Sequence, residues 1–241
     1  MFSSVVTDFW RATFSGEDLV PPDAAFAVAV NADLGEDRRV MVLHTTDGAV
    51  RAVLTPSLAD AVGLRELRPR SEADLRRALS EAGVALHTAD NLFYFSRSEL
   101  DTLLGEDPHP DVRRLSDADA ALFARFQSSA PQQDLEDAYV ELDHWAVFGA
   151  FTQDRLAAAA SMYPWGDARL ADLGVLTLPA YRGRGHARAV VRAACKYAAQ
   201  QGYEPQYRCQ SDNYASLAVA KAAKLTHFGT WEVVSSDSPG A

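Results

Sequence analysis

Apolar and polar residues alternate in short blocks along the first hundred residues, and these blocks predict strands and a helix. Apolar segments at residues 40–44 and 49–54 are predicted strands, because the Asp47-Gly48 pair between them favours a hairpin turn. Ser71 is suited to cap a helix that runs to residue 82, where Gly83 would end it. A short apolar and aromatic segment at residues 91–95 predicts one more strand.

The pattern changes at residues 105–110, where Pro108 and Pro110 lie among polar residues and interrupt it. Beyond this break we predict strands at residues 112–115, 145–151, 156–162, 171–178, 206–209 and 230–234, and helices at 116–126, at 187–198 and from 213. Strands that interleave with helices predict an α/β fold. We therefore expect a smaller N-terminal α/β domain over residues 1–108 and a second domain over residues 111–241.

Composition and charge narrow the class of protein. The chain has 241 residues, of which 48% are hydrophobic and 23% charged, as in ordinary globular proteins. No apolar run approaches the roughly 20 residues of a membrane helix, and residues 1–14 lack a secretory signal pattern, so we expect a cytoplasmic protein without a membrane partner. A net charge of −10 disfavours nucleic acid as a partner.

The small number of cysteines and the lack of known catalytic motifs in the first 108 residues limit the chemistry that the sequence predicts. The two cysteines, Cys195 and Cys209, are too few for a disulfide framework or a four-thiolate metal site, and we expect no metal. Residues 1–108 contain no metal-ligand spacing, nucleophile elbow or glycine-rich phosphate loop. The sequence therefore assigns the N-terminal domain no role.

The informative segment is Tyr-Arg-Gly-Arg-Gly-His-Ala at residues 181–187, which joins a predicted buried strand to a helix. The first amides of a helix have no partners inside it, and the helix dipole favours an anion there. Gly183 and Gly185 have no side chains to hold a phosphate away from those amides. Because Arg182, Arg184 and Arg188 add positive charge, the segment predicts a site for phosphate or pyrophosphate.

The amino-acid sequence of this segment resembles a known motif. Arg182-x-x-Gly185-x-Ala187, preceded by Val-Leu-Thr-Leu-Pro at residues 175–179, resembles the acetyl-coenzyme A binding motif of the GNAT superfamily of N-acetyltransferases. Downstream, Asn-Tyr-Ala-Ser at residues 213–216 resembles the second signature block of that family. The resemblance covers about residues 111–235. It implies a mixed central sheet with flanking helices and acetyl-CoA as a co-substrate.

The resemblance also implies the roles of individual cofactor-binding residues. Backbone groups of Val175, Leu176 and Thr177 would pair with the pantetheine arm, and Asn213 and Ser216 would lie near its other side. The amides at the helix start, with the arginines around them, would hold the pyrophosphate; these residues are Arg182, Gly183, Arg184, Gly185, His186, Ala187 and Arg188. In this family the amine acceptor attacks the thioester directly.

The candidate catalytic residue is Asp172, which lies seven residues before Pro179, where several family members have a catalytic glutamate. It would deprotonate the acceptor or hold its ammonium group; the structural alternative is a carboxylate that caps the strand or faces solvent. Glu141, Asp143 and His144 form a second candidate group, with a solvated charged face as the alternative. This chain departs from the family at Ala220, where many members have a tyrosine that protonates the leaving thiolate.

Three hypotheses on function follow. The first is an N-acetyltransferase that moves an acetyl group from acetyl-CoA to an amine in a ternary complex. The second, motivated by Ala220, is a non-catalytic acyl-CoA-binding regulatory module. The third is an interaction protein that acts through its acidic surface. For the enzyme, a small-molecule amine and a peptide amine both stay open as acceptors, and so does a homodimer.

Overall fold

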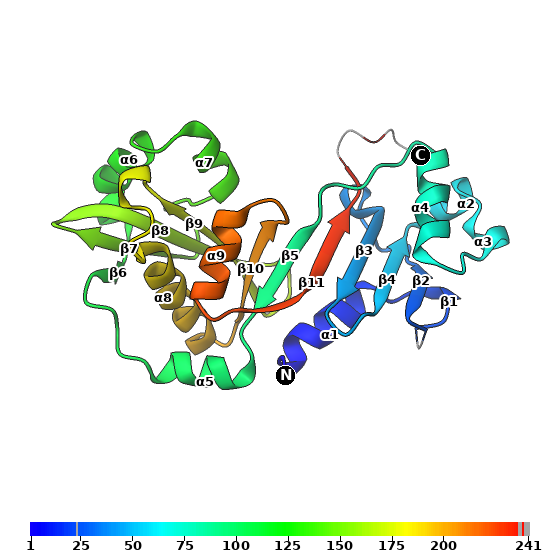
Figure 1. Cartoon of the computed structure of the whole chain (residues 1–241), viewed down its shortest axis with the longest axis horizontal. Coiled ribbons are helices and arrows are strands. Elements are labelled where there is room, and N and C mark those ends of the chain that lie inside the picture. The colour runs from blue at the N-terminus through cyan, green and yellow to red at the C-terminus, as the bar shows by residue number, and fades with distance from the viewer. Residues whose placement is uncertain (23, 236–237, 239–241) are drawn as a thin grey trace. The chain divides into compact units, whose positions relative to one another are not determined.

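The chain divides into two compact units, as the computed structural model shows for residues 1–22, 24–235 and 238 (Figure 1). Unit 1 contains Met1–Val6, Phe93–Arg208 and Asn213–Thr226, and unit 2 contains Thr7–Leu92, Cys209–Asp212 and the segment from His227. Residues 93–108 thus lie in unit 1, and the last strand lies almost wholly in unit 2. The predicted domain boundary between residues 108 and 111 falls inside unit 1, and the division of the chain into domains over residues 1–108 and 111–241 stays a prediction.

Unit 2 is a sheet with helices packed on it. Its strands follow the order β1-β2-β4-β3-β11, and they are β1 (Glu17–Val20), β2 (Phe26–Val30), β3 (Val40–Thr45), β4 (Val50–Leu54) and β11 (Thr226–Val233). Strands β2 and β4 are parallel and the other neighbours are antiparallel. The remaining elements are α1 (Ser4–Thr13), which begins in unit 1, η1 (Glu36–Arg38), α2 (Pro56–Ala61), α3 (Leu64–Leu67) and α4 (Glu72–Glu81). The predicted hairpin at residues 40–54 is confirmed as β3 and β4.

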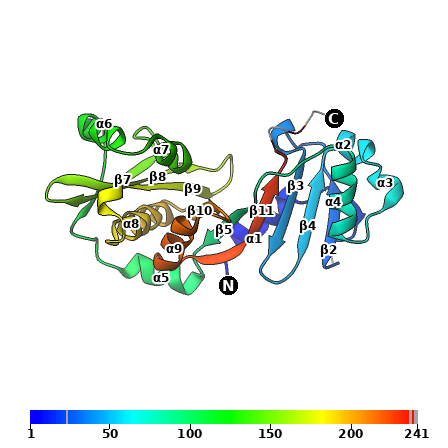
Figure 2. The same cartoon turned by 45° about the horizontal axis from the view of Figure 1, so that its top comes forward.

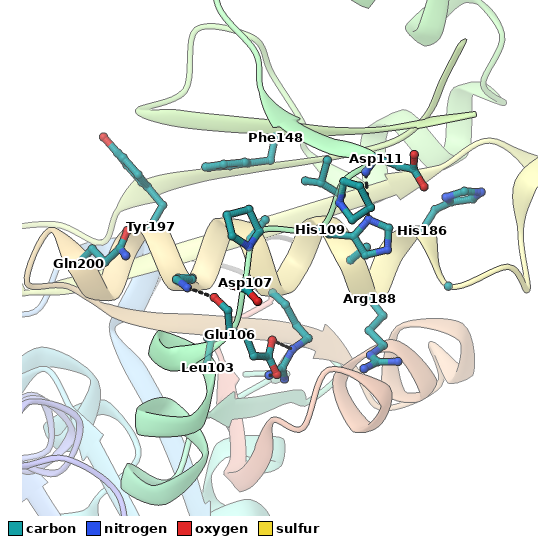
Figure 3. A pocket seen from close by; sticks show the side chains of 18 of the residues that line it. Leu103, Glu106, Asp107, His109, Asp111, Phe148, His186, Arg188, Tyr197 and Gln200 are labelled. Carbon is teal, nitrogen blue, oxygen red and sulfur yellow. Dashed lines mark hydrogen bonds and ion pairs between the residues drawn. The ribbon is translucent and has the colours of Figure 1, made fainter. Parts of the chain in front are cut away.

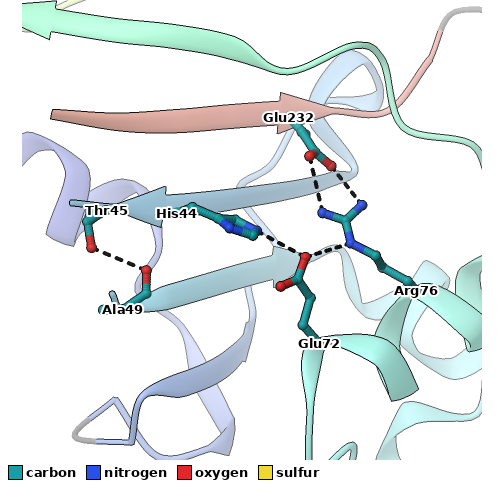
Figure 4. Close-up of polar contacts among 6 residues, drawn as sticks. All are labelled: His44, Thr45, Ala49, Glu72, Arg76 and Glu232. Carbon is teal, nitrogen blue, oxygen red and sulfur yellow. Dashed lines mark hydrogen bonds and ion pairs between the residues drawn. The ribbon is translucent and has the colours of Figure 1, made fainter. Parts of the chain in front are cut away.

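Helix α4 shows how the sequence builds unit 2. Ser71 caps it by accepting a hydrogen bond from the Asp74 amide, as predicted, and Leu75 and Leu79 are buried in the core. On its polar side, the Glu72 carboxylate lies 3.0 Å from Nε2 of His44 on β3 and accepts from Arg76 Nε at 2.6 Å. Arg76 in turn donates both terminal nitrogens to Glu232 on β11 (Figure 4). These ion pairs tie the helix to two neighbouring strands.

Unit 1 contains the predicted mixed sheet. Its strands follow the order β10-β9-β8-β7-β6, and they are β6 (Val112–Arg114), β7 (Ala146–Thr152), β8 (Arg155–Pro164), β9 (Leu170–Thr177) and β10 (Glu204–Gln210). Strand β9 is parallel to β10 and antiparallel to β8, and β5 (Asp90–Tyr94) crosses from one unit to the other along the chain. The predicted α/β fold class with a mixed sheet is confirmed.

Helices cover both faces of this sheet (Figure 2). On one face, η2 (Asp117–Asp119), α6 (Ala120–Ser128) and α7 (Gln132–Ala138) enclose a core that contains Phe123, Phe126 and Leu176. On the other face, α8 (His186–Gln200) packs on β7, β8 and β9. Residues 157–160 on β8 are alanines without solvent exposure. Ala159 lies in the core on the α6 face, so Ala158 and Ala160 face α8, and their small size lets the helix lie close to the sheet. The remaining helices are α5 (Arg97–Gly105), η3 (Pro179–Tyr181) and α9 (Tyr214–Ala222).

Candidate functional site

The site begins where β9 and β10 stop pairing. The two strands are in register from Leu170 opposite Glu204 to Leu173 opposite Tyr207, and no pair is formed beyond Leu173 within the described part of the chain. On its other side, β9 stays paired with β8 as far as Thr177. Residues 174–177 therefore have one edge bonded to β8 and one edge without a strand partner.

The direction of the backbone groups follows from one hydrogen bond. The Leu178 amide donates to the Ala157 carbonyl at 3.0 Å. Because backbone groups alternate in direction along a strand, Leu176 directs its amide and carbonyl to β8, while Val175 and Thr177 direct theirs to the open edge. Val175 and Thr177 thus have backbone groups on the open edge, whereas the backbone of Leu176 is used by β8 and its side chain lies in the core. Pairing of these residues with a pantetheine arm stays a prediction.

The loop after β9 presents a row of free amides. Gly183 and Gly185 have φ angles of +73° and +86°, a region that side chains disfavour, and Gly185 is the N-cap of α8. A Cβ atom at either glycine would meet no atom within 4 Å, so the loop faces open space. No backbone amide from Gly183 to Arg188 has an acceptor among the residues described. This is the geometry that the sequence predicts for an anion site at a helix start.

The three arginines of the loop have different surroundings. Arg182 is occupied, because its Nη2 donates to Asp134 on α7 at 2.5 Å and its Nε donates to the Thr177 carbonyl at 3.3 Å. The Arg184 guanidinium lies 5.8 Å from the Tyr181 ring centre, and neither Arg184 nor Arg188 has an acidic partner within the described residues. Arg182 therefore fixes the loop to its neighbours, and Arg184 and Arg188 are the cations left for an anion.

Three more predicted residues have contacts that the sequence alone did not indicate. His186 Nε2 lies 3.2 Å from the Thr152 hydroxyl on β7, which leaves Nδ1 of the ring at the helix start. Asn213 caps α9 by accepting from the Ser216 amide at 3.0 Å, and Tyr207 donates its hydroxyl to the Ser216 carbonyl. Asn213 and Ser216 thus form one structural pair at the start of α9.

Asp172 is enclosed in a network of donors. Its side chain accepts from the Tyr163 hydroxyl at 3.0 Å, from Gln206 Nε2 at 2.9 Å and from Arg208 Nη2 at 2.8 Å, and the residue is only 4% exposed. The Arg208 guanidinium also lies over the Trp165 ring, 4.4 Å from its centre. With donors on both oxygens, this carboxylate is a buried anchor for three side chains.

A cluster of rings lies beside Asp172, on the face of the sheet that α7 covers. The rings of Tyr139, His144 and Tyr163 lie within 5.7 Å of one another, centre to centre. Burial together with the neighbouring Asp172 raises the pKa of the Tyr163 hydroxyl, and burial lowers the pKa of His144 against the pull of Asp143 and Glu141. His144 is therefore a neutral imidazole at neutral pH.

Ser161 fixes the orientation of His144. Its hydroxyl has no solvent exposure, accepts from the Glu141 amide at 3.3 Å and lies 2.8 Å from His144 Nδ1. Because a buried hydroxyl needs an acceptor for its own proton, Ser161 donates to Nδ1, and neutral His144 carries its proton on Nε2. The sequence pointed to Glu141, Asp143 and His144 as a group, and the structure singles out His144 by this contact.

A close approach of backbones places these side chains. A Cβ atom at Gly174 would lie 2.1 Å from the carbonyl oxygen of Ala138, the last residue of α7. Gly174 is also opposite Ser161 in the β8–β9 register and is the first residue after β9 leaves β10. The end of α7, the ring cluster and the open edge of β9 therefore meet at one point, which sequence spacing alone cannot show.

The comparisons with known proteins agree with this geometry. Residues 114–223 match the model of the acetyltransferase (GNAT) family. These residues form a GNAT acetyltransferase domain. The matched stretch includes the open edge of β9, the loop of free amides and the start of α9. None of the curated proteins matches the sequence.

Solved structures resemble the whole chain or part of it. An acetyltransferase of the GNAT family from Colwellia psychrerythraea is 18% identical, with 97% of each chain covered and a TM-score of 0.53, which shows a shared fold. The GNAT domain of S. lividans PAT is 16% identical over 52% of this chain and 89% of that one, with a TM-score of 0.43. The aminoglycoside N-acetyltransferase AAC(6')-Iy in complex with CoA is 20% identical over 47% and 89%, with a TM-score of 0.37.

Metal sites, membrane-spanning helices and reactive cysteines are absent from the described parts of the protein. No group of three or more His, Cys, Asp or Glu side chains there could hold a metal ion. No helix there has the length and the apolar character that crossing a bilayer requires. Burial raises the pKa of both Cys195 and Cys209 to about 12, so both thiols are protonated and poorly nucleophilic at neutral pH.

Proposed function

We propose that the protein is an N-acetyltransferase that moves an acetyl group from acetyl-CoA to an amine by direct attack in a ternary complex. The observation that carries this proposal is the combination of the open β9 edge with the free amides of Gly183 to Arg188. A strand edge suits the amide groups of a pantetheine arm, and the helix start suits a pyrophosphate. Acetyl-CoA would supply the activated thioester, and the family match supports an acyl-CoA donor.

The residues of this chain would divide the work as follows. Val175 and Thr177 would hold the pantetheine arm through their backbones, and an amide on this open edge would face the oxyanion of the transition state. The amides from Gly183 to Arg188, with the guanidinium of Arg184, would hold the pyrophosphate. Asn213 would contact the arm from the start of α9, since its Nδ2 is not used in capping.

On the acceptor side, the Asp172 network supports a positioning role. The carboxylate oxygens of Asp172 already accept hydrogen bonds from Tyr163, Gln206 and Arg208. We therefore propose that Asp172 holds the Tyr163 ring in contact with the His144 ring. Neutral His144, with its proton on Nε2, would donate a hydrogen bond to the acceptor molecule. The attacking amine would lose its proton to water, and the acceptor would be a small-molecule or a peptide amine.

Gly185 provides the test of cofactor binding. Replacing it with valine, Gly185→Val, places a branched side chain between the amides and the pyrophosphate, and we expect acetyl-CoA to bind at least about tenfold more weakly, or about 1.4 kcal/mol. The matched control is Gly48→Val in the unit 2 hairpin, whose φ of +89° and empty Cβ position are like those of Gly185. Calorimetry gives the affinity and thermal unfolding gives the stability.

We expect both variants to lower the melting temperature by similar amounts, because both force a side chain into a left-handed backbone region. Only Gly185→Val should weaken acetyl-CoA. A folded Gly185→Val protein that binds acetyl-CoA as tightly as the wild type would overturn the proposed phosphate site.

A non-catalytic acyl-CoA-binding module is the second candidate function. It is favoured by two observations: Asp172 is fully engaged, and Ala220 is buried with no exposure where many family members have a tyrosine. Release of free thiol from acetyl-CoA over a panel of amines separates the two functions. Turnover with any amine supports the enzyme, and tight binding without turnover supports the module.

A further inference from the structure

The proposed function leaves one face of the unit 1 sheet for the amine acceptor. On the other face, a pocket runs along α8 from the proposed pyrophosphate site, and residues 106–111 cross in front of the helix there (Figure 3). The face that α6 and α7 cover carries the ring cluster of Tyr139, His144 and Tyr163. If the donor lies on the α8 side, the amine reaches the thioester from the side of the rings.

Tyr139 has a backbone conformation that tyrosine rarely adopts. It is the C-cap of α7 with φ +46° and ψ +52°, in the left-handed region where glycine or asparagine is usual. The residue is 56% exposed, so burial does little to offset this strain. Strained backbone of this kind concentrates at ligand sites. Here it brings the Tyr139 ring to 4.9 Å from the His144 ring and to 5.7 Å from the Tyr163 ring, centre to centre.

The rings of Tyr139 and Tyr163 form an aromatic corner. Their planes are inclined by 81°, so the two rings do not cover each other as stacked rings would. Burial and the neighbouring Asp172 raise the pKa of the Tyr163 hydroxyl, which keeps it protonated and the ring uncharged at neutral pH. The face of an uncharged aromatic ring has a negative electrostatic potential and attracts cations. The corner is therefore suited to an ammonium group.

The chain around this corner carries negative charge without matching cations. Residues 134–143 include five acidic residues, and residues 126–154 include no Lys or Arg. Within the described part of the chain, only one of these five carboxylates has an ion-pair partner. Burial lowers the pKa of His144, and Asp143 and Glu141 act against this effect, which places their negative charge near the rings. The surroundings thus add to the attraction of the rings for a cation.

We propose that the aromatic corner of Tyr139 and Tyr163, with Glu141 and Asp143 beside it, binds a second cationic group of the acceptor, and that the acceptor is a small di- or polyamine. This inference rests on the proposed function, which it deepens by naming the substrate class. One amino group would attack the thioester as a free amine, while the other stays protonated in the corner. The Nε2 proton of His144 is left for an oxygen atom where the acceptor has one.

The contact between α7 and β9 favours a short and narrow acceptor. A Cβ atom at Gly174 would lie 3.0 Å from the carbonyl oxygen of Tyr139, and Gly174 is the first residue of the open edge. The corner and the open edge are therefore neighbours, which a few carbon atoms can span. Because the end of α7 covers this part of β9, an alkyl chain fits there more readily than a peptide backbone does.

The first experiment compares amines that differ only in the second charge. Release of free thiol from acetyl-CoA is measured with 1,5-diaminopentane against pentylamine, and with (5-aminopentyl)trimethylammonium against 6,6-dimethylheptylamine, in which carbon replaces the quaternary nitrogen. We expect the second charge to raise kcat/KM at least about tenfold in both pairs, mainly through a lower KM. A trimethylammonium group has no N–H, so a preference in the second pair comes from charge and ring contact rather than from hydrogen bonds.

The second experiment changes the corner itself. Tyr139→Phe keeps an aromatic face, whereas the matched control Tyr139→Leu keeps apolar bulk in the same left-handed backbone region without one. We expect Tyr139→Phe to keep the preference for the charged amine and Tyr139→Leu to lower it at least about fivefold. Because the preference is a ratio of two amines on one protein, a general loss of activity cancels.

The contribution of the carboxylates is tested in the same way. Asp143→Asn should lower the preference for the charged amine about threefold, because it removes a negative charge beside the rings. Asp101→Asn, at an exposed position on α5, is the control and should keep the preference of the wild type. An Asp143→Asn protein with the full preference would contradict the part assigned to this carboxylate.

The outcomes separate the cation site from the function on which it rests. Equal kcat/KM for charged and uncharged amines, or the wild-type preference in Tyr139→Leu, overturns the site and leaves the acetyltransferase proposal standing. Turnover of a lysine-rich peptide without turnover of any small amine overturns the substrate class. If no amine reacts, the proposed function fails, and calorimetry with (5-aminopentyl)trimethylammonium then decides the site alone: binding that Tyr139→Leu loses and Tyr139→Phe keeps supports it, and no binding overturns it.

Discussion

At the scale of single residues, the burial of Asp172 favours a structural role over the role of catalytic base that its sequence position suggests. A carboxylate seven residues before Pro179 suits a catalytic base, but in the structure both oxygens accept hydrogen bonds and the residue is 4% exposed. A base needs a free lone pair within reach of the proton it accepts. The donors Tyr163, Gln206 and Arg208 fill the positions that a substrate proton would need.

Asp172→Asn separates the two roles. Because the change removes the charge that Arg208 pairs with, we expect the free energy of unfolding to fall by about 2–4 kcal/mol, measured by urea unfolding. The control Asp101→Asn, an exposed position on α5, should change it by less than about 0.5 kcal/mol. If Asp172 were the base, turnover would drop by about a hundredfold or more while stability stayed near that of the wild type, and the positioning role would be wrong.

At the scale of elements, the contact between α7 and β9 depends on one missing side chain. Gly174 lets the Ala138 carbonyl approach to a distance at which a Cβ atom would lie 2.1 Å away. Since the obstacle is backbone rather than a flexible side chain, an added methyl group must displace the end of α7. The ring of Tyr139, the residue after α7, would move with it.

Gly174→Ala should therefore lower stability by about 1–3 kcal/mol and raise the KM for the amine acceptor more than the KM for acetyl-CoA. The matched control is Gly105→Ala at the end of α5, where a Cβ atom meets nothing within 4 Å. Urea unfolding and steady-state kinetics give the two readouts. An unchanged KM for the amine in a destabilised Gly174→Ala protein would show that the end of α7 has no part in acceptor binding.

At the scale of the whole molecule, two half-buried histidines link stability to pH. Burial lowers the pKa of His144 in unit 1 and of His227 in unit 2 below the ordinary value of 6.5. In the unfolded chain both groups take up protons near that ordinary value, so the unfolded state binds more protons than the folded state at acidic pH. The two histidines thus stabilise the fold fully above pH 6.5 and progressively less as the pH falls below it.

We expect the free energy of unfolding to be lower at pH 5.5 than at pH 7.5, and the difference to be smaller in His144→Gln, which cannot take up the proton. Urea unfolding at the two pH values measures both quantities. His87→Gln, an exposed histidine, is the control and should leave the difference as in the wild type. A His144→Gln protein with the full wild-type difference would show that His144 does not contribute to it.

The sequence by itself determined the elements whose signals are local. The hairpin at residues 40–54, the capped helix from Glu72 and the loop of Gly183 and Gly185 follow from turn residues, caps and apolar periodicity over a few positions. It also determined the fold class and the GNAT resemblance of the second half. Helices α1, α5 and α7 were not predicted, because in such short segments tertiary packing outweighs the intrinsic preference.

The tertiary structure decided everything that depends on distant residues meeting. Hydrogen-bond direction along β9, set by its pairing with β8, gave Val175 and Thr177 the open edge and took Leu176 out of it. Arg208 and Gln206, more than 30 residues along the chain, donate the hydrogen bonds that enclose the Asp172 carboxylate. Arg192 on α8 holds Glu106 in an ion pair across 86 positions of sequence. Such contacts are fixed by packing and pairing between elements, and no local pattern of residues encodes them.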